Sequence, residues 1–328
     1  MRNKIKKIGV MTSGGDAPGM NAAIRAVVRA CSYYNVECVG VYRGFQGLIE
    51  GDFTALTARN VNNTINRGGT ILKTARSEDF KTKKGREKAY QQLQNKQIDA
   101  MVLIGGDGTF TGGMIFNKEY QFPCIGIPCT IDNDIFGTNS TIGFDTALNT
   151  VVEAIDKIRD TASSHNRLFF VEVMGRDAGF IALNSGVGSG AEEILIPEEN
   201  LGLDRLLESL KRSKRSGKSS SIVVVAEGDK IGKNVFELAN YVEENLPEYE
   251  VRVSVLGHMQ RGGSPSCFDR VLASRLGVKS VELLLDGKSN LMVGLMNNKI
   301  ETTELNKAVK GEHHINKELL RVSDIMSI

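Results

Sequence analysis

Short runs rich in Ile and Val alternate with longer amphipathic stretches along most of this sequence. This alternation is typical of βα units, in which each strand of a parallel sheet is followed by a helix that covers the sheet. We therefore expect an α/β protein. The predicted strands are 8–12, 36–42, 100–104, 123–127, 168–173, 222–226 and 251–255, and the predicted helices are 20–32, 86–95, 145–160, 203–215, 235–245 and 268–285.

The composition limits the classes of protein that this chain can represent. With 328 residues, 41% of them hydrophobic, the chain can form two domains of ordinary size or one large α/β domain. Its 41 basic and 39 acidic side chains give a net charge of only +2. Binding to nucleic acid or to an anionic membrane relies on a large positive excess, so we expect neither partner.

The cysteines and the N-terminal sequence favour a cytoplasmic protein. The cysteines are Cys31, Cys38, Cys124, Cys129 and Cys267. They form no CxxC pair and lie mostly in apolar segments, which is typical of reduced thiols and disfavours a zinc site. The apolar stretch near the N-terminus is too short for a signal peptide, and no later run has the length of a membrane span.

Many of the 35 glycines fall where a predicted strand ends. The segments are SGGD at 13–16, GGDGT at 105–109, MGRDAG at 174–179 and LGHMQRGG at 256–263. In an open parallel sheet, ligands bind beyond the carboxyl ends of the strands, where loops and helix N-termini converge. We therefore expect all four loops to lie on the functional edge. The first of them opens a helix and suits a phosphate, although a turn whose glycines serve packing only is an alternative.

Three acidic residues follow two of the apolar strands. In IGGDGTFTGG at 104–113, a carboxylate at a phosphate-binding turn would repel the ligand unless a divalent cation intervened, so Asp107 is a candidate Mg²⁺ partner. The alternative is that Asp107 is the N-cap of a helix that begins at Thr109. In IPCTIDND at 127–134, Asp132 and Asp134 can divide the work of accepting a proton and supporting the metal or the loop, and an Asx-turn is the alternative.

Single basic residues near these turns suit phosphorylated ligands. The guanidinium group matches phosphate oxygens in a bidentate fork, so scattered arginines at loop ends favour phosphate binding over a broad basic surface. Any one of them could instead be a surface charge, and His258 could be a structural, hydrogen-bonded histidine. The candidates are Arg76, Arg167, Arg176, Arg252, His258 and Arg261.

Between about residue 5 and about residue 285, nine colinear segments resemble the bacterial 6-phosphofructokinases, the ATP-dependent phosphofructokinase A family. They are SGGDAPGMNAAIR, GGT with the following AR, IGGDGT, TIDNDIFGT, TIGFDTA, SSHNR, VEVMGR, VAEG and LGHMQRGGSP. The resemblance implies transfer of the γ-phosphoryl group of Mg-ATP to the 1-hydroxyl of fructose 6-phosphate, which gives fructose 1,6-bisphosphate and ADP in glycolysis. It also implies two doubly wound, Rossmann-like parallel-sheet domains with the active site in the cleft between them.

The resemblance further implies the parts that bind each substrate. Residues 1–143 with about 262–310 would bind ATP, and 144–261 with the C-terminal tail would bind fructose 6-phosphate. The ATP residues would be Gly15, Arg76, Ser77, Gly106, Asp107, Gly108 and Thr109, with Asp107 on Mg²⁺. The sugar-phosphate residues would be Thr130, Ile131, Asp132, Met174, Gly175, Arg176, Glu227, His258, Met259, Gln260 and Arg261. Arg167 and Arg252 would reach the 6-phosphate from a neighbouring subunit of a homotetramer.

In the mechanism that the resemblance implies, Asp132 accepts the proton of the sugar hydroxyl. Arg76, Arg176 and Mg²⁺ stabilise charge on the transferring phosphoryl group, with Thr130 in the same site and Asp134 supporting the metal and the loop.

Departures from the family pattern leave two alternatives open. Cys129 stands where ATP users usually have glycine and pyrophosphate users commonly have lysine, which keeps a pyrophosphate-dependent phosphofructokinase in view. Gly108 favours ATP, because pyrophosphate users place there an aspartate that would crowd the nucleotide. Phe45 replaces a common tyrosine. The second alternative is a catalytically silent sugar-phosphate-binding regulator, although Asp107, Asp132, Asp134 and Arg176 are all retained.

An effector site for ADP or phosphoenolpyruvate is implied only in part. Ser216 and Ser220 stand where basic or histidine side chains are usual, and an expected arginine is displaced to Arg59. We therefore expect weakened effectors. The residues that match the family's effector site are Arg25, Arg29, Arg159, Gly190, Glu192 and Lys218.

Overall fold

The computed structural model of the chain describes residues 5–165, 167–199, 202–215, 221–231 and 234–326. The chain forms two compact units. Unit 1 comprises Met1–Ile131, Ile135–Thr146 and Arg261–His313, and unit 2 comprises Asp132–Asp134, Ala147–Gln260 and His314–Ile328. The chain therefore passes from one unit to the other several times.

Unit 1 contains a seven-stranded sheet with the order β11-β10-β5-β4-β1-β2-β3. The inner strands pair in parallel, and β3 and β11 are antiparallel at the two edges. The strands are β1 (Lys7–Thr12), β2 (Glu37–Val41), β3 (Phe53–Leu56), β4 (Ala100–Gly105), β5 (Cys124–Pro128), β10 (Leu291–Met296) and β11 (Lys299–Glu304). Every residue of β4 and β5 is buried, as expected for central strands covered on both faces.

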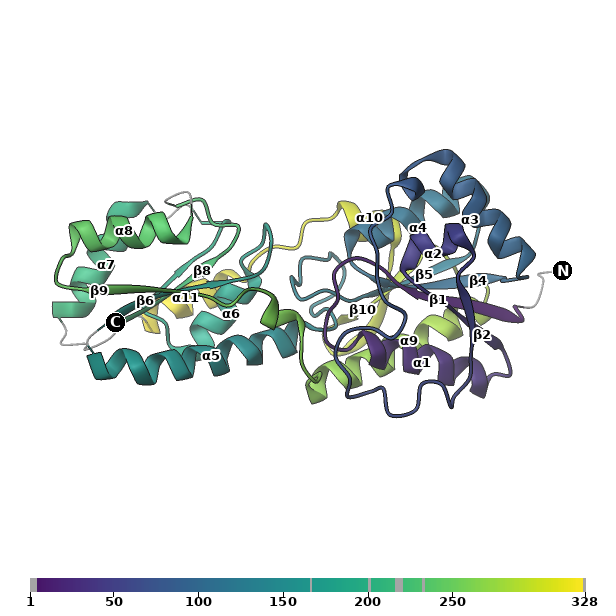
Figure 1. Cartoon of the computed structure of the whole chain (residues 1–328), viewed down its shortest axis with the longest axis horizontal. Helices are drawn as coiled ribbons and strands as arrows, with labels where there is room; N and C mark the ends of the chain where they lie inside the picture. The colour runs from purple at the N-terminus through teal and green to yellow at the C-terminus, as the bar shows by residue number, and fades with distance from the viewer. Residues whose placement is uncertain (1–4, 166, 200–201, 216–220, 232–233, 327–328) are drawn as a thin grey trace. The chain divides into compact units, whose positions relative to one another are not determined.

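Helices cover both faces of this sheet (Figure 1). On one face lie α1 (Met20–Tyr33) and α9 (Cys267–Leu285), which pack side by side. On the other lie α2 (Gly44–Glu50), α3 (Lys83–Asn95), α4 (Asp107–Tyr120) and α10 (Leu305–Lys310), with the short 3₁₀ helix η1 (Asp79–Lys81). Apolar side chains from α2, α3, α4 and the strands form one continuous buried cluster under that face.

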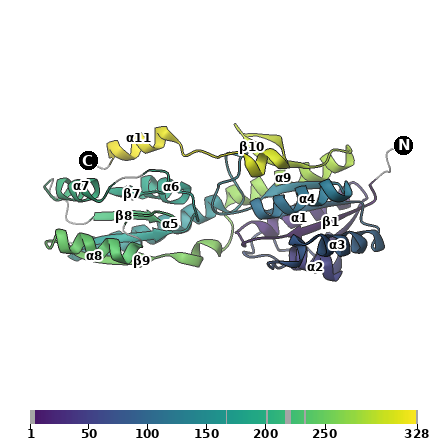
Figure 2. The ribbon, with the colours of Figure 1, turned by 90° about the horizontal axis from the view of Figure 1, so that it is seen from above.

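Unit 2 contains a four-stranded, fully parallel sheet with the order β7-β8-β6-β9. Its strands are β6 (Arg167–Val173), β7 (Glu193–Leu195), β8 (Ser221–Ala226) and β9 (Glu250–Val255), followed by the 3₁₀ helix η2 (Gly257–Arg261). One face is covered by α7 (Leu203–Arg215) and α8 (Val235–Asn245), whose apolar side chains share a core cluster. The other is covered by α5 (Phe144–His165) and α6 (Phe180–Ser189), and α11 (Lys317–Met326) lies beside α6 (Figures 1 and 2).

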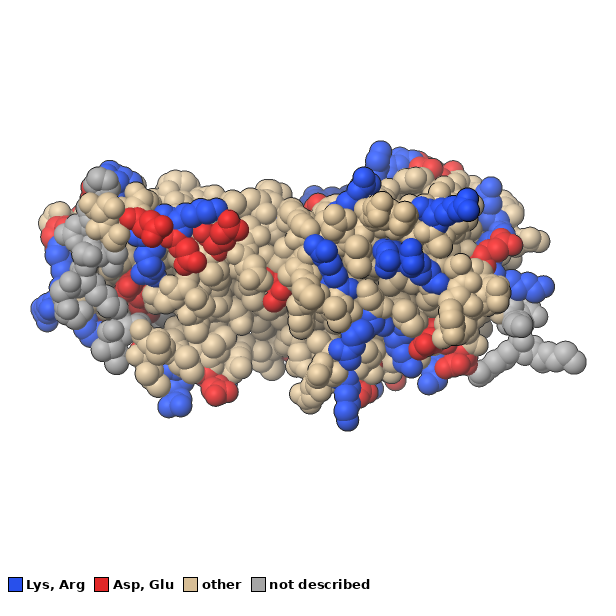
Figure 3. All heavy atoms as spheres, turned by 90° about the horizontal axis from the view of Figure 1, so that it is seen from below, with Lys and Arg blue, Asp and Glu red and all other residues tan. Residues whose placement is uncertain are grey.

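The predicted α/β class with parallel sheets in two units is confirmed, and each predicted strand and helix is present. The elements that were not predicted are β3, β7, β10, β11, α2, α6, α10, α11, η1 and η2, and a helix at α4 was considered only as the alternative that begins at Thr109. Within the described ranges, no helix is both long and apolar enough to cross a bilayer. On the face shown in Figure 3, Lys and Arg side chains are interspersed with acidic and neutral ones, in keeping with the small net charge.

Candidate active site

Three neighbouring parallel strands of unit 1 bring three predicted loops to one edge of the sheet. The strands β1, β4 and β5 are adjacent, so the segments that follow them begin side by side. The loops are joined at their bases: Ser13 N donates to the carbonyl of Ile104 at 3.0 Å, and Cys129 N donates to that of Gly105 at 3.0 Å. Thr109 Oγ1 also donates to the carbonyl of Ser13 at 3.1 Å. Of the four glycine-containing loops expected on one edge, those at 13–16 and 105–109 share this edge, whereas those at 174–179 and 256–263 follow strands of the unit 2 sheet.

The turn after β4 forms the amino end of α4. The helix begins at Asp107, and Gly106 is its N-cap, so the alternative in which Asp107 is an N-cap is wrong. A Cβ atom on Gly108 would meet no atom within 4 Å, and Gly108 is exposed. Backbone N–H groups at this end of a helix attract anions. The turn can therefore hold phosphate oxygens with Asp107 in its first turn.

A single carboxylate at this turn suits Mg²⁺. The described part of the chain contains no group of three or more His, Cys, Asp or Glu side chains placed to hold a metal ion. Mg²⁺ bound together with a nucleotide needs only one or two protein carboxylates, because phosphates and water supply the other ligands. Asp107, as a hard oxygen donor, fits that requirement.

The side chain of Arg261 lies on the loop that follows β1. Its Nη1 donates to the carbonyl of Asp16 at 3.2 Å, and a Cβ atom on Gly15 would come within 2.6 Å of the same nitrogen. The resemblance assigned Gly15 to ATP and Arg261 to the sugar phosphate. Within unit 1 these residues are neighbours, so one guanidinium group faces the small-residue loop.

The other residues expected near the nucleotide differ in their exposure. Arg76 is exposed in the long segment between β3 and η1. Ser77 Oγ donates to Gln46 at 2.8 Å and accepts from Phe80 N at 3.2 Å, so it helps to fix the start of η1. Phe45 is buried and stacks on Phe80 with ring centroids 4.0 Å apart. Phe45 therefore contributes to the core under α4.

The strand ends of unit 2 also bring predicted residues together. Arg176, which follows β6, adopts a left-handed backbone with φ of 58°, and its N–H donates to Glu227 Oε1 at 2.7 Å. The N–H of Met174 donates to Gln260 Oε1 at 3.2 Å, and Gln260 is fully buried. The loops after β6, β8 and β9 are therefore tied together, and Gly175 gives the turn between Met174 and Arg176 its positive φ of 143°.

The loop after β5 carries the two candidate carboxylates, and both belong to unit 2. Asp132 is buried. Burial raises the pKa of the Asp134 carboxyl, and the positive charge of Arg176 opposes that rise. Asp134 and Arg176 are therefore electrostatic neighbours. His258 and Met259 are exposed in η2, which argues against a buried structural role for His258.

Arg167 and Arg252 both precede the carboxyl ends of their strands in the unit 2 sheet. Arg167 opens β6 and pairs with Glu250, which opens β9 and also binds the guanidinium of Arg252. The hydrogen bond from Arg167 is the main cause of the lowered pKa of Glu250. Six residue steps separate Arg167 from the far end of β6, about 20 Å at the rise of a β-strand. Arg252 is in register with Phe169, four steps or about 13 Å from the same end, so the backbones of both arginines lie away from the turn that carries Arg176.

Three of the six matched effector residues gather beside α6. Arg159 Nη2 donates to the carbonyls of Ser189 and Gly190 at 2.9 and 2.8 Å, and Nη1 lies 3.7 Å from Glu192. Glu192 Oε2 accepts the N–H of Ile222 at 2.6 Å. These polar groups are therefore already engaged in contacts within the unit.

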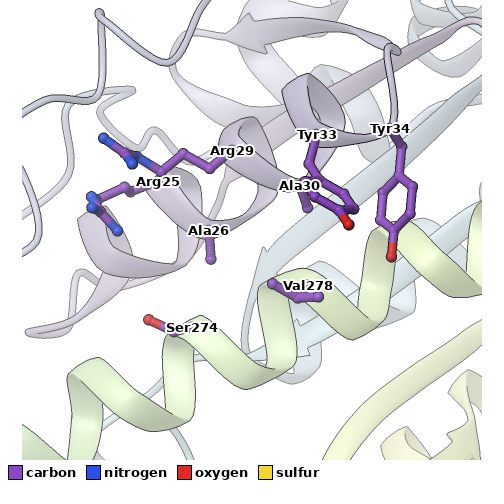
Figure 4. Close-up of a pocket in the computed structure, with 8 residues that line it drawn as sticks. All are labelled: Arg25, Ala26, Arg29, Ala30, Tyr33, Tyr34, Ser274 and Val278. Atoms are coloured by element: carbon purple, nitrogen blue, oxygen red, sulfur yellow. The ribbon is translucent and has the colours of Figure 1, made fainter.

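The remaining effector candidates are in α1 or outside the described residues. Arg25 and Arg29 line a pocket of about 330 Å³ between α1 and α9, together with Tyr33, Tyr34 and Val278 (Figure 4). Burial, followed by the charge of Arg29, lowers the pKa of Arg25. Lys218, Ser216 and Ser220 lie outside the described residues.

The sequence interpretation missed one residue close to the unit 1 loops, Asp269 of α9. Its side chain is fully buried, and burial raises its pKa to about 6 although donors from Thr146 and Gly143 favour the charged form. The only signal was the Ser-x-x-Asp spacing of Ser266 and Asp269, which marks a helix start. That spacing predicted nothing about the contacts that the carboxylate makes with α5.

The geometry defines an α/β protein whose glycine-containing loops gather at the carboxyl ends of parallel strands, with phosphate-type features at the start of α4. A family model described as phosphofructokinase matches residues 7–284. The chain therefore belongs to the phosphofructokinase family.

Individual relatives match along the whole chain. The chain is 51% identical to ATP-dependent 6-phosphofructokinase 2 of Bacteroides thetaiotaomicron, over 99% of each chain. It is 54% identical to ATP-dependent 6-phosphofructokinase 1 of Thermus thermophilus, over 99% of this chain and all of the relative. A solved phosphofructokinase of Saccharomyces cerevisiae superimposes with a TM-score of 0.89 and 36% identity, over 98% of this chain and 48% of the yeast chain. This chain thus spans about half the length of the yeast one.

Proposed function

We propose that this chain is an ATP-dependent 6-phosphofructokinase, which transfers the γ-phosphoryl group of Mg-ATP to the 1-hydroxyl of fructose 6-phosphate. The observation that carries the proposal is the turn at the start of α4, where Asp107 lies beside Gly108, a position with open space around it. The relatives that share 51 and 54% of its residues over their full length bear the same activity in their names. The products are fructose 1,6-bisphosphate and ADP, as in glycolysis in the cytoplasm.

Unit 1 residues would hold the nucleotide. Backbone N–H groups of the loop at 13–16 and of the turn at 106–109 face the phosphates, while Arg76 and Ser77 flank them. Asp107 would hold Mg²⁺, which neutralises phosphate oxygens when it is bound. The exposed side chain of Arg76 can turn toward the transferring group, whose developing negative charge it would stabilise.

Residues that are mostly in unit 2 would hold the sugar phosphate and carry out the proton transfer. Asp132 would accept the proton of the attacking hydroxyl, and Arg176 would stabilise the charge of the phosphoryl group. Asp134, beside Arg176, and Thr130 would keep the loop in place. The other contacts to the sugar phosphate would come from Met174, Gly175, Glu227, His258, Met259 and Gln260 of unit 2, and from Ile131 and Arg261 of unit 1.

A pyrophosphate donor is less well supported. The Cys129 thiol is buried, and burial raises its pKa further, so it stays neutral and does not replace the lysine of pyrophosphate users. A silent regulator is disfavoured because Asp107, Asp132, Asp134 and Arg176 are all present. A coupled assay with fructose 6-phosphate, run with ATP and with pyrophosphate, tests the function. Turnover with pyrophosphate alone, or with neither donor, would contradict the proposal.

A homotetramer with shared sites accounts for the position of Arg167 and Arg252. Arg167 opens β6, about 20 Å before its carboxyl end, and Arg252 is in register with Phe169, about 13 Å before that end, whereas Arg176 follows it. This separation favours a site to which Arg167 and Arg252 come from another subunit. In the proposed assembly, Arg167 and Arg252 serve the 6-phosphate in a neighbouring subunit.

Mixing two inactive variants is expected to restore part of the activity. Arg252→Ala removes the contributed arginine, and Asp132→Ala removes the base, so a mixed assembly contains some sites that lack neither. Activity should be measured after the two proteins are dissociated together and reassembled. Each variant put through the same cycle alone is the control. Full activity from an isolated monomer in sedimentation would contradict the shared site.

We also propose that ADP and phosphoenolpyruvate are weakened effectors. Arg159 and Glu192 already bind backbone groups around Gly190, so a ligand phosphate or its cation would have to compete for them. Arg25 and Arg29 remain available in α1 for a phosphorylated ligand. Titration of fructose 6-phosphate with and without phosphoenolpyruvate measures this response.

A further inference from the structure

The buried carboxylate of Asp269 joins the start of α9 to the start of α5. Its Oδ1 accepts the N–H of Gly143 at 2.9 Å. Its Oδ2 accepts the N–H of Thr146 at 2.9 Å and the Oγ1–H of Thr146 at 2.5 Å. Asp269 therefore satisfies backbone donors at the amino end of a helix that is not its own.

The arrangement differs from an ordinary capping box. In that motif the third residue of the helix would accept the N–H of the N-cap residue. Here the N–H of Ser266, the N-cap of α9, donates instead to Thr146 Oγ1 at 2.9 Å. Ser266 Oγ in turn donates to Asp145 at 2.5 Å. The two helix starts are therefore cross-linked by reciprocal hydrogen bonds, and Asp269 is directed toward α5.

Gly143 is the last residue before α5 and closes the loop that began after β5. The returning end of this loop is bonded to its outgoing end: Ile142 N donates to the Pro128 carbonyl at 3.1 Å, and Thr141 Oγ1 donates to the Thr130 carbonyl at 2.6 Å. Asp132 lies two residues beyond Thr130. Hydrogen bonds between adjacent residues thus link Asp269 to Thr130, two residues before the proposed base.

The same side chain also adjoins the loop that follows β1. Gly19, at the end of that loop, would place a Cβ atom 3.7 Å from the Cβ of Asp269, and Gly143 would place one 2.7 Å from that of Ala17. Gly19 and Gly143 have positive φ values of 111° and 102°, so the two loops approach at positions that favour glycine. Asp269 lies where the two loops of unit 1 meet.

We propose that Asp269 is a positioning residue for phosphoryl transfer, whose buried carboxylate fixes the returning end of the 129–143 loop and so places Asp132. The inference rests on the proposed function for the identity of the reaction. A purely structural role would stabilise the fold without a selective effect on turnover. The two roles are separated by comparing kcat, KM and local hydrogen exchange in matched variants of the full-length protein.

Asp269→Asn is expected to lower kcat roughly 10- to 100-fold while KM for ATP stays within about threefold, because small misplacements of a reacting group have effects of this size. An amide keeps one acceptor but presents N–H groups where the carboxylate accepted hydrogen bonds. The matched control is Asp99→Asn. Asp99 also accepts two backbone N–H groups, from Lys6 and Lys7 at 2.8 and 2.9 Å. It directly precedes β4, however, and so lies at the amino end of that strand. Asp99→Asn should keep kcat within about threefold.

A second pair of variants makes the test of the proposal independent of the Asp269→Asn substitution. Thr146→Val removes the hydroxyl that bonds to Asp269, and Thr146→Ser keeps it. We expect the valine variant to lose kcat and the serine variant to retain most of it. This pair gives the answer if Asp269→Asn fails to fold. Valine and serine variants of equal kcat, or an Asp269→Asn enzyme with wild-type kcat, would overturn the proposal.

Hydrogen–deuterium exchange provides a readout that does not depend on turnover. In Asp269→Asn, exchange should rise at least threefold in peptides covering 129–146, whereas Asp99→Asn should leave these peptides unchanged. If the wild-type protein lacks activity with fructose 6-phosphate and ATP, the proposed function fails, and the exchange data still test the positioning of the loop. Unchanged exchange at 129–146 in Asp269→Asn would overturn the inference.

Discussion

Replacing Asp132 with serine is expected to lower kcat by roughly 10²- to 10⁴-fold and to change KM for fructose 6-phosphate far less. A general base acts mainly in the transition state, where it receives the proton of the attacking hydroxyl. Serine at this position keeps a small polar side chain but is too weak a base to accept that proton. The loss should therefore appear in kcat when initial rates are measured across sugar-phosphate concentrations.

The neighbouring carboxylate supplies a matched control for this experiment. Asp134 lies in the same loop, and its charge is coupled to Arg176. Because one proton is removed in the reaction, Asp134→Ser should have a smaller effect on kcat than Asp132→Ser. An Asp132→Ser enzyme that retains most of its kcat would exclude Asp132 as the base. Equal losses in both variants would show that the charge of the loop matters more than proton acceptance.

Replacing Gly108 with aspartate is expected to lower kcat/KM with ATP by about 10²-fold or more. A new carboxylate in the first turn of α4 would face the nucleotide phosphates, and placing like charges together has an unfavourable free energy of several kcal/mol. The protein itself has room for the side chain, since a Cβ atom on Gly108 meets nothing within 4 Å. A negative charge in the first turn of a helix is also favourable for folding. The loss of activity should therefore come from the ligand and not from a disturbed fold.

Gly108→Asn isolates the effect of charge in this experiment. Asparagine has almost the same size as aspartate, so it measures the steric part of the loss alone. We expect Gly108→Asn to retain much more activity than Gly108→Asp, with both proteins showing wild-type circular dichroism. Unchanged kcat/KM for ATP in Gly108→Asp would mean that this turn does not contact the phosphoryl donor.

The sequence was most informative about the buried parallel strands and the long helices. Strands such as β4 and β8 are buried at every residue, so their uninterrupted apolar runs predicted buried strands. By contrast, a helix at α4 was only an alternative, and its residues Gly108, Gly112 and Gly113 disfavour a helix. The structure supplies the reason for two of them: a Cβ atom on Gly112 would come within 2.6 Å of the Phe45 ring, and one on Gly113 within 2.4 Å of Leu103 Cδ1. Close packing there outweighs helix propensity.

The hairpin of β10 and β11 was not predicted, although the Asn-Asn pair at its turn is a sequence signal for a hairpin. Asn297 and Asn298 both adopt left-handed backbone conformations, with φ of 50° and 63°, as a two-residue hairpin turn requires. The pair stands between two runs that are suited to strands. β7, with only three residues, is too short for any periodicity to be read.

For the candidate site, the sequence predicted the loops but not their mutual contacts. Strand ends and glycines place a loop at an edge of a sheet without specifying which distant side chain reaches it. The contact of Arg261 with the Asp16 carbonyl spans 245 positions, and those of Asp269 with α5 span more than 120. Such pairings depend on how the helices pack, which a local pattern does not contain.

During translation the two sheets are completed at different times, because unit 1 is built from segments that are far apart in the sequence. The unit 2 sheet is complete once β9 has emerged at Val255, whereas the unit 1 sheet waits for β10 and β11, which end at Glu304. Until then β5, the neighbour of β10, presents an unpaired hydrogen-bonding edge. The nascent chain thus carries an unfinished unit 1 sheet while the sheet of unit 2 can already form. A fragment that ends after residue 260 lacks β10, so the edge of β5 stays unpaired, and we expect such fragments to aggregate.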